Sequence, residues 1–219
     1  ELFYVASVRK SVLAMLYGPF VAEGTIDLDK TLAELDMDDV QGLTDAEQQA
    51  TIEHLITARS GVYHPASNPG DNLSDAPPRG SQRPGSYFLY SNWDFNAAGA
   101  AFEREPSTNL YDALTNRLAR RSRYPAYHMI LSARDMARLG LLMLREGRWG
   151  DEQVLPARWA RRIVSVTTPR ESMNPADQRE MPCGYGAMWW VWDGPDAVGP
   201  YEGAYTARGA YGQYITVLP

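Results

Sequence analysis

The chain of 219 residues is 44% hydrophobic and 22% charged, which is typical of a globular protein with a buried core. Its net charge of −6, without a dense basic run, argues against nucleic acid as the main partner. The longest apolar stretch, residues 12–22, is too short to span a membrane and is interrupted by Gly18 and Pro19. The single cysteine, Cys183, excludes an internal disulfide and is best explained as a small buried residue.

Apolar residues at helical spacing predict a mostly buried first helix over residues 7–23, ended by Gly24. Pro19 has no N–H to donate to the carbonyl of Met15, so we expect a kink or a break in this helix. A threonine cap, acidic residues in the first turn and a glycine stop predict a second helix over residues 43–61.

The next segment, residues 62–86, is rich in Pro, Gly, Asn and Ser and predicts a long surface loop. A loop of this length serves as a lid or a binding wall, or it is disordered. Helical spacing then resumes in four segments: residues 94–103, 109–120, 132–147 and 156–167. Aromatic and β-branched residues predict strands within residues 184–193 and 211–219.

A serine and a lysine lie one helical turn apart at the start of the first helix. Lysine is scarce here, because Lys10 and Lys30 are the only two among 21 basic residues. Helix positions i and i+3 are neighbours, so the Lys10 amine can reach the Ser7 hydroxyl group. Apolar neighbours favour the uncharged amine, which can then act as a base for a serine nucleophile. Ser7 can equally be only the N-cap of the helix.

Other catalytic signatures are absent from the sequence. It contains no G-x-S-x-G, no Walker loop and no H-E-x-x-H, and its three histidines, at positions 54, 64 and 128, stand in unrelated contexts. His54 falls within a predicted helix and is interpreted as a structural histidine. These absences leave Ser7 and Lys10 as the candidate chemistry.

A second motif, Tyr90-Ser91-Asn92, is the only Tyr-x-Asn of the chain and follows the long loop. Together with the Ser-x-x-Lys at residues 7–10, it resembles the serine hydrolases that share the fold of class C β-lactamases and penicillin-binding proteins. Further segments resemble the family in the expected order and cover most of the chain: FYVASVRKSV, EGTIDLDKTL, TIEHLITARSG, LSARDMARLGLLMLREGRW and ARGAYGQYITVLP.

The resemblance implies a role for each motif residue. Ser7 would be the nucleophile, Lys10 the base that activates it, and Tyr90 the phenol that exchanges protons with the leaving group. Asn92 would hold the acyl-side amide or ester of the substrate. The reaction would need neither a metal nor an organic cofactor. A buried core tyrosine is the alternative interpretation of Tyr90.

The third motif of the family is where this chain departs. Class C enzymes have Lys-Thr-Gly on the strand beside the site, and many relatives have His-x-Gly. Counting back from the last predicted strand places Ala204, Tyr205 and Thr206 there, without a lysine to receive a substrate carboxylate. Arg208 can supply a cation instead or be solvated, and the backbone N–H of Ala207 would complete the oxyanion hole. The chain is therefore more similar to the esterase and amidase branches, including the nylon-oligomer hydrolases.

The implied fold class is α/β (α+β), β-lactamase/transpeptidase-like: an antiparallel sheet flanked by helices plus an all-helical domain. We place the sheet domain at residues 1–24 and 166–219, and the helical domain with the Tyr-x-Asn loop at residues 25–165, with the site in the crevice between them. Relatives have further strands at both ends and extra residues near positions 120–121. We therefore expect the sequence to be a portion of a larger protein.

The predicted function is a serine hydrolase that cleaves an ester or amide bond through an acyl-enzyme on Ser7. Its partner would be a small-molecule ester, amide or peptide. The alternatives are a β-lactamase or D-alanyl peptidase of the same fold, a catalytically inactive binding module, and an unrelated helical interaction protein. The resemblance favours a periplasmic or extracellular location, while the acyl group, the leaving group and the oligomeric state do not follow from the sequence.

Overall fold

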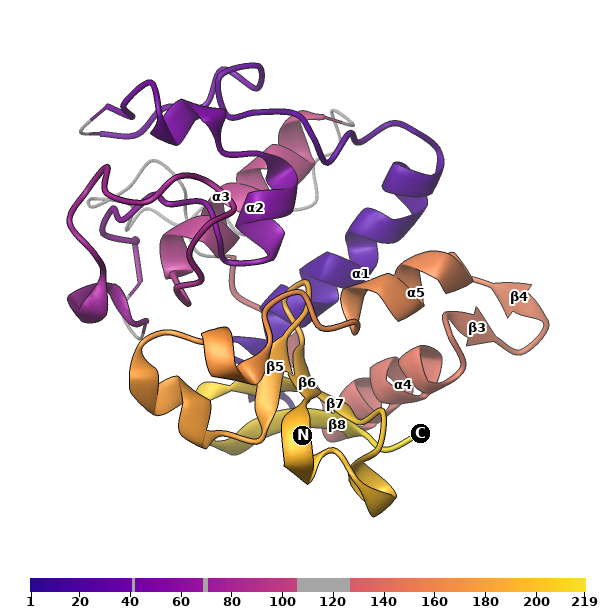
Figure 1. Ribbon diagram of the computed structural model, residues 1–219. Coiled ribbons are helices and arrows are strands. Elements are labelled where there is room, and N and C mark those ends of the chain that lie inside the picture. Colours follow the sequence, from indigo (N-terminus) through magenta and orange to yellow (C-terminus); the bar gives the residue numbers. More distant parts are fainter. Residues whose placement is uncertain (41, 69–70, 106–126) are drawn as a thin grey trace. The chain divides into compact units, whose positions relative to one another are not determined.

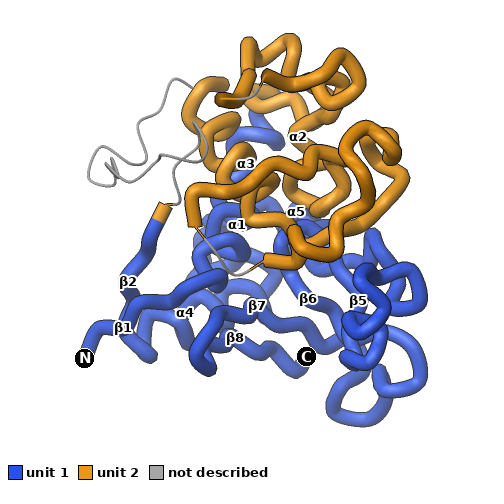
Figure 2. Tube along the Cα trace, turned by 90° about the vertical axis from the view of Figure 1, so that its left-hand side faces the viewer, with its two compact units in different colours: residues 1–23, 128–219 blue, residues 24–127 orange. Residues whose placement is uncertain are grey.

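The computed structural model describes residues 1–40, 42–68, 71–105 and 127–219 (Figure 1). Two compact units make up the chain, coloured separately in Figure 2. Unit 1 comprises residues 1–23 and 128–219, and unit 2 comprises residues 24–127. The helix predicted over residues 109–120 and the join near positions 120–121 lie outside the described residues.

Unit 1 contains an antiparallel sheet with the strand order β5-β6-β7-β8. Its strands are β5 (Cys183–Tyr185), β6 (Trp190–Trp192), β7 (Tyr205–Gly209) and β8 (Gln213–Val217). In the β7–β8 register, Tyr205 pairs with Val217 and Ala207 with Ile215, and all four are buried. Because side chains alternate along a strand, these residues form one apolar face of the sheet. The strands predicted from aromatic and β-branched residues are thus present.

Two short antiparallel pairs complete the strands of unit 1. Strand β1 (Phe3–Tyr4) pairs with β2 (Ile130–Leu131), so the segment before the first helix is joined to the later part of the chain. Strand β3 (Arg148–Trp149) pairs with β4 (Glu152–Gln153) in a small hairpin.

Three helices pack on this unit: α1 (Val8–Ala22), α4 (Ala133–Leu144) and α5 (Ala157–Ile163). Helix α1 contacts α5, β7 and β8, and α4 contacts β8. The approach of α1 to α5 is close, since a Cβ at Gly18 would lie 2.5 Å from the ring of Trp159. The indole Nε1 of Trp159 also donates a hydrogen bond of 2.7 Å to the carbonyl of Ala14.

Helix α1 confirms the predicted buried first helix, and it is not broken at Pro19. The helix continues through Pro19 to Ala22. Proline removes only one intrahelical bond, and the next turn still closes because the Glu23 N–H donates to the Pro19 carbonyl at 2.9 Å.

Unit 2 is helical in its described residues, which form no strand. It contains α2 (Ile52–Ile56), α3 (Asn92–Arg104) and two 3₁₀ turns, η1 (Glu47–Gln49) and η2 (Leu73–Asp75). The continuous helix predicted over residues 43–61 is wrong. The backbone is extended at Thr51, with ψ 168°, because this threonine caps α2 by accepting a hydrogen bond from the His54 N–H. His54 returns the bond by accepting the Thr51 N–H at its Nδ1, as a structural histidine.

The sheet with its flanking helices and the helical unit confirm the predicted fold class. The division of the chain differs from the expected one, because α4 and α5 belong to unit 1. The reason is their packing, on β8 and on α1 respectively. Among the described residues, no helix has the length and apolar character that would be required to cross a bilayer.

Candidate active site

Ser7 occupies the N-cap position of α1, yet its side chain does not act as a cap. Its φ and ψ are −73° and −8°, and in the described structure its hydroxyl group accepts no hydrogen bond from the first turn. The preceding residue, Ala6, has a φ of +45°. This left-handed conformation costs a residue with a Cβ about 1–2 kcal/mol. Strain of this kind is concentrated at functional sites, where it aims a side chain.

Lys10 lies one turn after Ser7 and is buried. Its N–H donates to the Ser7 carbonyl at 3.0 Å, which closes the first turn of α1. The side chain is 1% exposed. Lysine is almost never buried to this extent without a specific partner or role. The next residue, Ser11, is also buried, and its hydroxyl group donates to the Met188 carbonyl at 2.5 Å.

The end of strand β7 lies against the Ser7 turn. A Cβ at Gly209 would be 2.5 Å from the Val5 carbonyl oxygen and 3.3 Å from the Ser7 nitrogen. Only glycine fits this close approach. The reason is the lack of a side chain and not the backbone conformation, since any residue can adopt the φ of −120° at this position. Strand β7 therefore meets the Ser7 turn closely at Gly209, two residues after Ala207, the residue at which the sequence predicts the oxyanion contact.

Arg208 packs on aromatic side chains. Its guanidinium carbon lies 5.3 Å from the ring centroid of Trp190 and 5.9 Å from that of Tyr214, and its Nη1 is 2.7 Å from the sulfur of Met181. Since side chains alternate along β7, Arg208 lies on the face opposite to the one that Gly209 turns toward Ser7. The structure thus gives Arg208 two cation–π contacts, and its proposed role as a cation for a substrate carboxylate stays a prediction.

Tyr90 and Asn92 lie at the start of α3 in unit 2. The Tyr90 ring is partly exposed and contacts Phe95, with ring centroids 4.9 Å apart. Asn92 is 1% exposed. Its N–H donates to Asp71 Oδ2 at 3.0 Å, and its side-chain amide lies 3.5 Å from the Asn68 carbonyl.

Asp94, two residues after Asn92, is a buried carboxyl group. It accepts hydrogen bonds from the Ser60 hydroxyl group at 2.6 Å and from the Ser60 N–H at 3.3 Å. Burial raises the pKa of Asp94 to about 8, and the nearby charge of Asp71 acts in the same direction, against the two bonds from Ser60. At neutral pH, Asp94 is therefore mostly uncharged.

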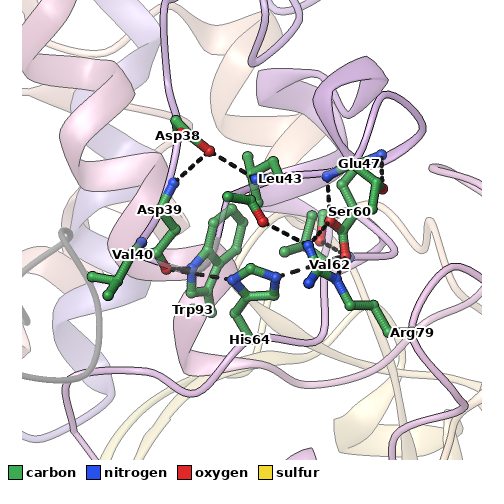
Figure 3. Close-up of polar contacts among 12 residues, drawn as sticks. Asp38, Asp39, Val40, Leu43, Glu47, Ser60, Val62, His64, Arg79 and Trp93 are labelled. Carbon is green, nitrogen blue, oxygen red and sulfur yellow. Dashed lines mark hydrogen bonds and ion pairs between the residues drawn. The ribbon is translucent and has the colours of Figure 1, made fainter.

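A second buried network in unit 2 ties down the Pro- and Gly-rich loop that precedes Tyr90 (Figure 3). His64 lies between two carboxylates, with Nδ1 3.7 Å from Asp39 and Nε2 3.8 Å from Glu47. Glu47 accepts two hydrogen bonds from Arg79, at 2.9 and 2.7 Å. Asp39 also accepts the indole N–H of Trp93 at 2.6 Å, which joins the network to α3.

Sequence reasoning did not find several of these residues: Ala6, Ser60, Asp71, Asp94 and Gly209. Two of them carry a local signal. A glycine in a strand marks a close backbone approach, which fits Gly209 at the end of β7, although the predicted strand begins only at residue 211. An acidic residue in the first turn of a helix, such as Asp94, is usually explained by the helix dipole. No cluster of three or more His, Cys, Asp or Glu side chains that could hold a metal occurs within the described ranges.

The fold and the serine on a buried helix define the class of β-lactamase/transpeptidase-fold proteins. The sequence model of the family described as Beta-lactamase matches residues 1–123. This match covers more than half of the chain, which belongs to the beta-lactamase family. A search of curated protein sequences gives no match.

Solved structures support the same fold. A Bacillus anthracis protein with the provisional description 6-aminohexanoate-dimer hydrolase has a TM-score of 0.69 and 19% identity, over 100% of this chain and 64% of that one. The octameric penicillin-binding protein homologue from Pyrococcus abyssi has a TM-score of 0.67 and 16% identity, over 100% and 59%. A family VIII carboxylesterase has a TM-score of 0.64 and 13% identity, over 99% and 74%. At such identities the likeness is one of fold, and the chain spans less than two thirds of the first two proteins.

Proposed function

We propose that this chain is a serine hydrolase that cleaves an ester or amide bond through an acyl-enzyme on Ser7. The observation that carries the proposal is the Ser7 turn: a hydroxyl group that caps no amide, held after a strained residue and one turn before a buried lysine. A serine that served only as the N-cap would bond to the first-turn amides. The Tyr-x-Asn motif and the family support the same reaction.

The proposed reaction has two halves. Ser7 Oγ attacks the carbonyl carbon while the Lys10 amine takes its proton. The bond from the carbonyl carbon to the leaving oxygen or nitrogen then breaks, and the leaving group receives a proton by way of Tyr90. Water hydrolyses the acyl-enzyme by the reverse sequence and restores Ser7.

The oxyanion would be stabilised at the N-terminus of α1. The first amides of a helix have no intrahelical acceptor, and the Ser7 N–H lies beside the end of β7. Gly209 is the residue of β7 at this point, so we assign the strand side of the oxyanion site to the backbone around Gly209. Ala207 has no part in this assignment.

The packing of Arg208 supports an esterase or amidase. The family lysine that receives a carboxylate is missing, and the guanidinium group of Arg208 is engaged by Trp190 and Tyr214. A substrate held by its acyl-side amide or ester, through Asn92, needs no such cation. The names of two structural neighbours, a carboxylesterase and a 6-aminohexanoate-dimer hydrolase, are in line with this substrate class.

The second candidate is a β-lactamase or D-alanyl peptidase, which the family match favours. A panel of one nitrophenyl ester, one nitroanilide and one chromogenic cephalosporin separates it from the first. Turnover of the ester or the anilide, with little cephalosporin turnover, supports the esterase or amidase. Rapid cephalosporin turnover with little ester activity would overturn it.

The decisive experiment is intact-mass analysis after exposure to a fluorophosphonate. We expect one adduct on the wild-type protein and none on Ser7→Ala. Ser11→Ala is the matched control, because Ser11 lies on the same helix but bonds to the Met188 carbonyl; it should still be labelled. No adduct on the folded wild-type protein would favour the non-catalytic binding module.

A further inference from the structure

The Tyr90-Ser91-Asn92 turn is not stabilised by a side-chain cap of its own. Ser91 is the N-cap residue of α3, but its side chain makes no cap hydrogen bond. Its hydroxyl group is buried and has no partner among the described residues. Because Ser91 supplies no cap, the position of Tyr90 depends on other segments of unit 2.

Residues 58–60, which follow α2, bond to the chain on both sides of this turn. Before it, the Leu89 N–H donates to the Ala58 carbonyl at 3.0 Å. After it, Asp94 accepts the hydroxyl group and the N–H of Ser60, at 2.6 and 3.3 Å. Residues 58–60 thus hold the chain on both sides of the motif. The motif itself is bonded to a second segment, since the Asn72 N–H donates to the Tyr90 carbonyl at 3.1 Å and the Asn92 N–H to Asp71 Oδ2 at 3.0 Å.

Ser60 is itself fixed. Its hydroxyl oxygen accepts the Val62 N–H at 2.9 Å while its proton is donated to Asp94. Both side chains are buried, at 1% exposed for Ser60 and 2% for Asp94. Loss of either partner leaves a polar group buried without its bond, and a movement of the first turn of α3 would relieve this.

We propose that Asp94 is a positioning residue for the reaction: through its bonds to Ser60 it fixes the first turn of α3, and with it the Tyr90 phenol and Asn92. This inference rests on the proposed hydrolase function. Asp94 acts through Tyr90 and Asn92 and is not assigned any contact with substrate.

The Asp94 side chain can do this without a charge. Burial, with a contribution from Asp71, raises the pKa of Asp94 to about 8, so the neutral carboxyl group predominates at pH 7. Asparagine has nearly the same shape and is also neutral. Its carbonyl oxygen can accept the shorter bond, from the Ser60 hydroxyl group at 2.6 Å, while its NH2 group cannot accept the longer bond from the Ser60 N–H at 3.3 Å. The conservative variant Asp94→Asn should therefore restore most of what Asp94→Ala loses.

The test compares Ser7-dependent turnover in Asp94→Ala, Asp94→Asn, Ser60→Ala and Glu47→Gln. Glu47 is the matched control, a buried carboxyl group of the same unit whose bonds go to Arg79 and Thr44. We expect Asp94→Ala and Ser60→Ala to lower kcat about 10-fold or more, because a displacement of Tyr90 and Asn92 by a fraction of an ångström is enough for such a loss. In Asp94→Asn and Glu47→Gln, kcat should stay within about 3-fold of the wild-type value. The double variant with both Asp94→Ala and Ser60→Ala should be little slower than Asp94→Ala alone, because both substitutions break the same Ser60–Asp94 hydrogen bonding.

The outcomes separate this inference from the proposed function. If Asp94→Ala turns over substrate at the wild-type rate, the positioning role is refuted and the hydrolase stands. If the wild-type protein shows no Ser7-dependent turnover, both fall. If Asp94→Ala does not fold, Ser60→Ala decides, because it removes only the hydroxyl group, with its bonds to Asp94 and to the Val62 N–H, and keeps the Ser60 N–H bond to Asp94; an unchanged kcat in that folded variant refutes the role. Equal losses in Glu47→Gln would refute it as well, since they would show a general effect of destabilising unit 2.

Discussion

Replacing Gly209 by alanine tests whether the approach of β7 to the Ser7 turn serves catalysis. The new Cβ would lie 2.5 Å from the Val5 carbonyl oxygen, and such contacts essentially never fall below 3.0 Å. Strand β7 and residues 5–7 must therefore move apart by several tenths of an ångström. The φ of −120° adds no backbone strain, so the perturbation is purely one of volume.

A matched substitution lies elsewhere in the same unit. A Cβ at Gly184 would be 2.6 Å from the Thr168 carbonyl oxygen, again a backbone atom. Overpacking of this kind costs about 1–3 kcal/mol, and we expect both variants to lose a similar free energy of unfolding. Only Gly209→Ala displaces the Ser7 amide, and a misplacement of this size predicts a loss of about 10- to 100-fold in the acylation rate.

Two assays decide the outcome. Urea denaturation gives the free energy of unfolding of each variant, and the rate of fluorophosphonate labelling gives the reactivity of Ser7. Gly209→Ala should label slowly and Gly184→Ala at the wild-type rate. The reasoning would be refuted if Gly209→Ala were destabilised but labelled at the wild-type rate. It would also be refuted if the labelling rate of Gly184→Ala fell as much as that of Gly209→Ala.

Three further predictions follow from single contacts. Lys10→Arg should abolish most fluorophosphonate labelling, because a guanidinium group does not accept a proton at neutral pH and a general base contributes about 100-fold or more; rapid labelling of this variant would remove Lys10 as the base. Asp94→Asn should change the pH dependence of stability. Because burial raises the pKa of Asp94 to about 8, the folded wild-type protein keeps this proton between about pH 4 and pH 8, whereas the unfolded protein has lost it. The free energy of unfolding of the wild type therefore falls as the pH rises through this range, and the variant becomes more stable relative to the wild type. Parallel curves of the free energy of unfolding against pH, from urea denaturation at pH 5 to 8, would contradict this. Ser132→Ala removes the hydroxyl group that accepts the Asp135 N–H at 3.1 Å and should cost about 1 kcal/mol without changing turnover; a calorimetric scan that shows no loss would refute the capping role.

The local elements of this protein were open to prediction because their causes lie within a few residues. Ser132 begins α4 through a reciprocal bond with Asp135, three positions later, and that pattern is legible in the sequence. The Ser7 and Lys10 pair is likewise a matter of one helical turn. Thr51 shows the limit: the sequence predicts that a helix runs through it, but Thr51 is extended, because it caps α2 and also forms an isolated β-bridge with Thr31, 20 positions earlier.

What only the tertiary structure decided is which distant groups meet. The residues around Asp94 in the sequence do not indicate a hydrogen bond to Ser60, 34 positions earlier. The residues around Val5 likewise do not predict the close approach of Gly209. Such contacts arise because apolar faces must be buried together, and the burial brings polar groups within range of one another at any separation in the chain. The sequence by itself determined the family resemblance, the candidate nucleophile and its helix, whereas the packing determined which residues hold them in place.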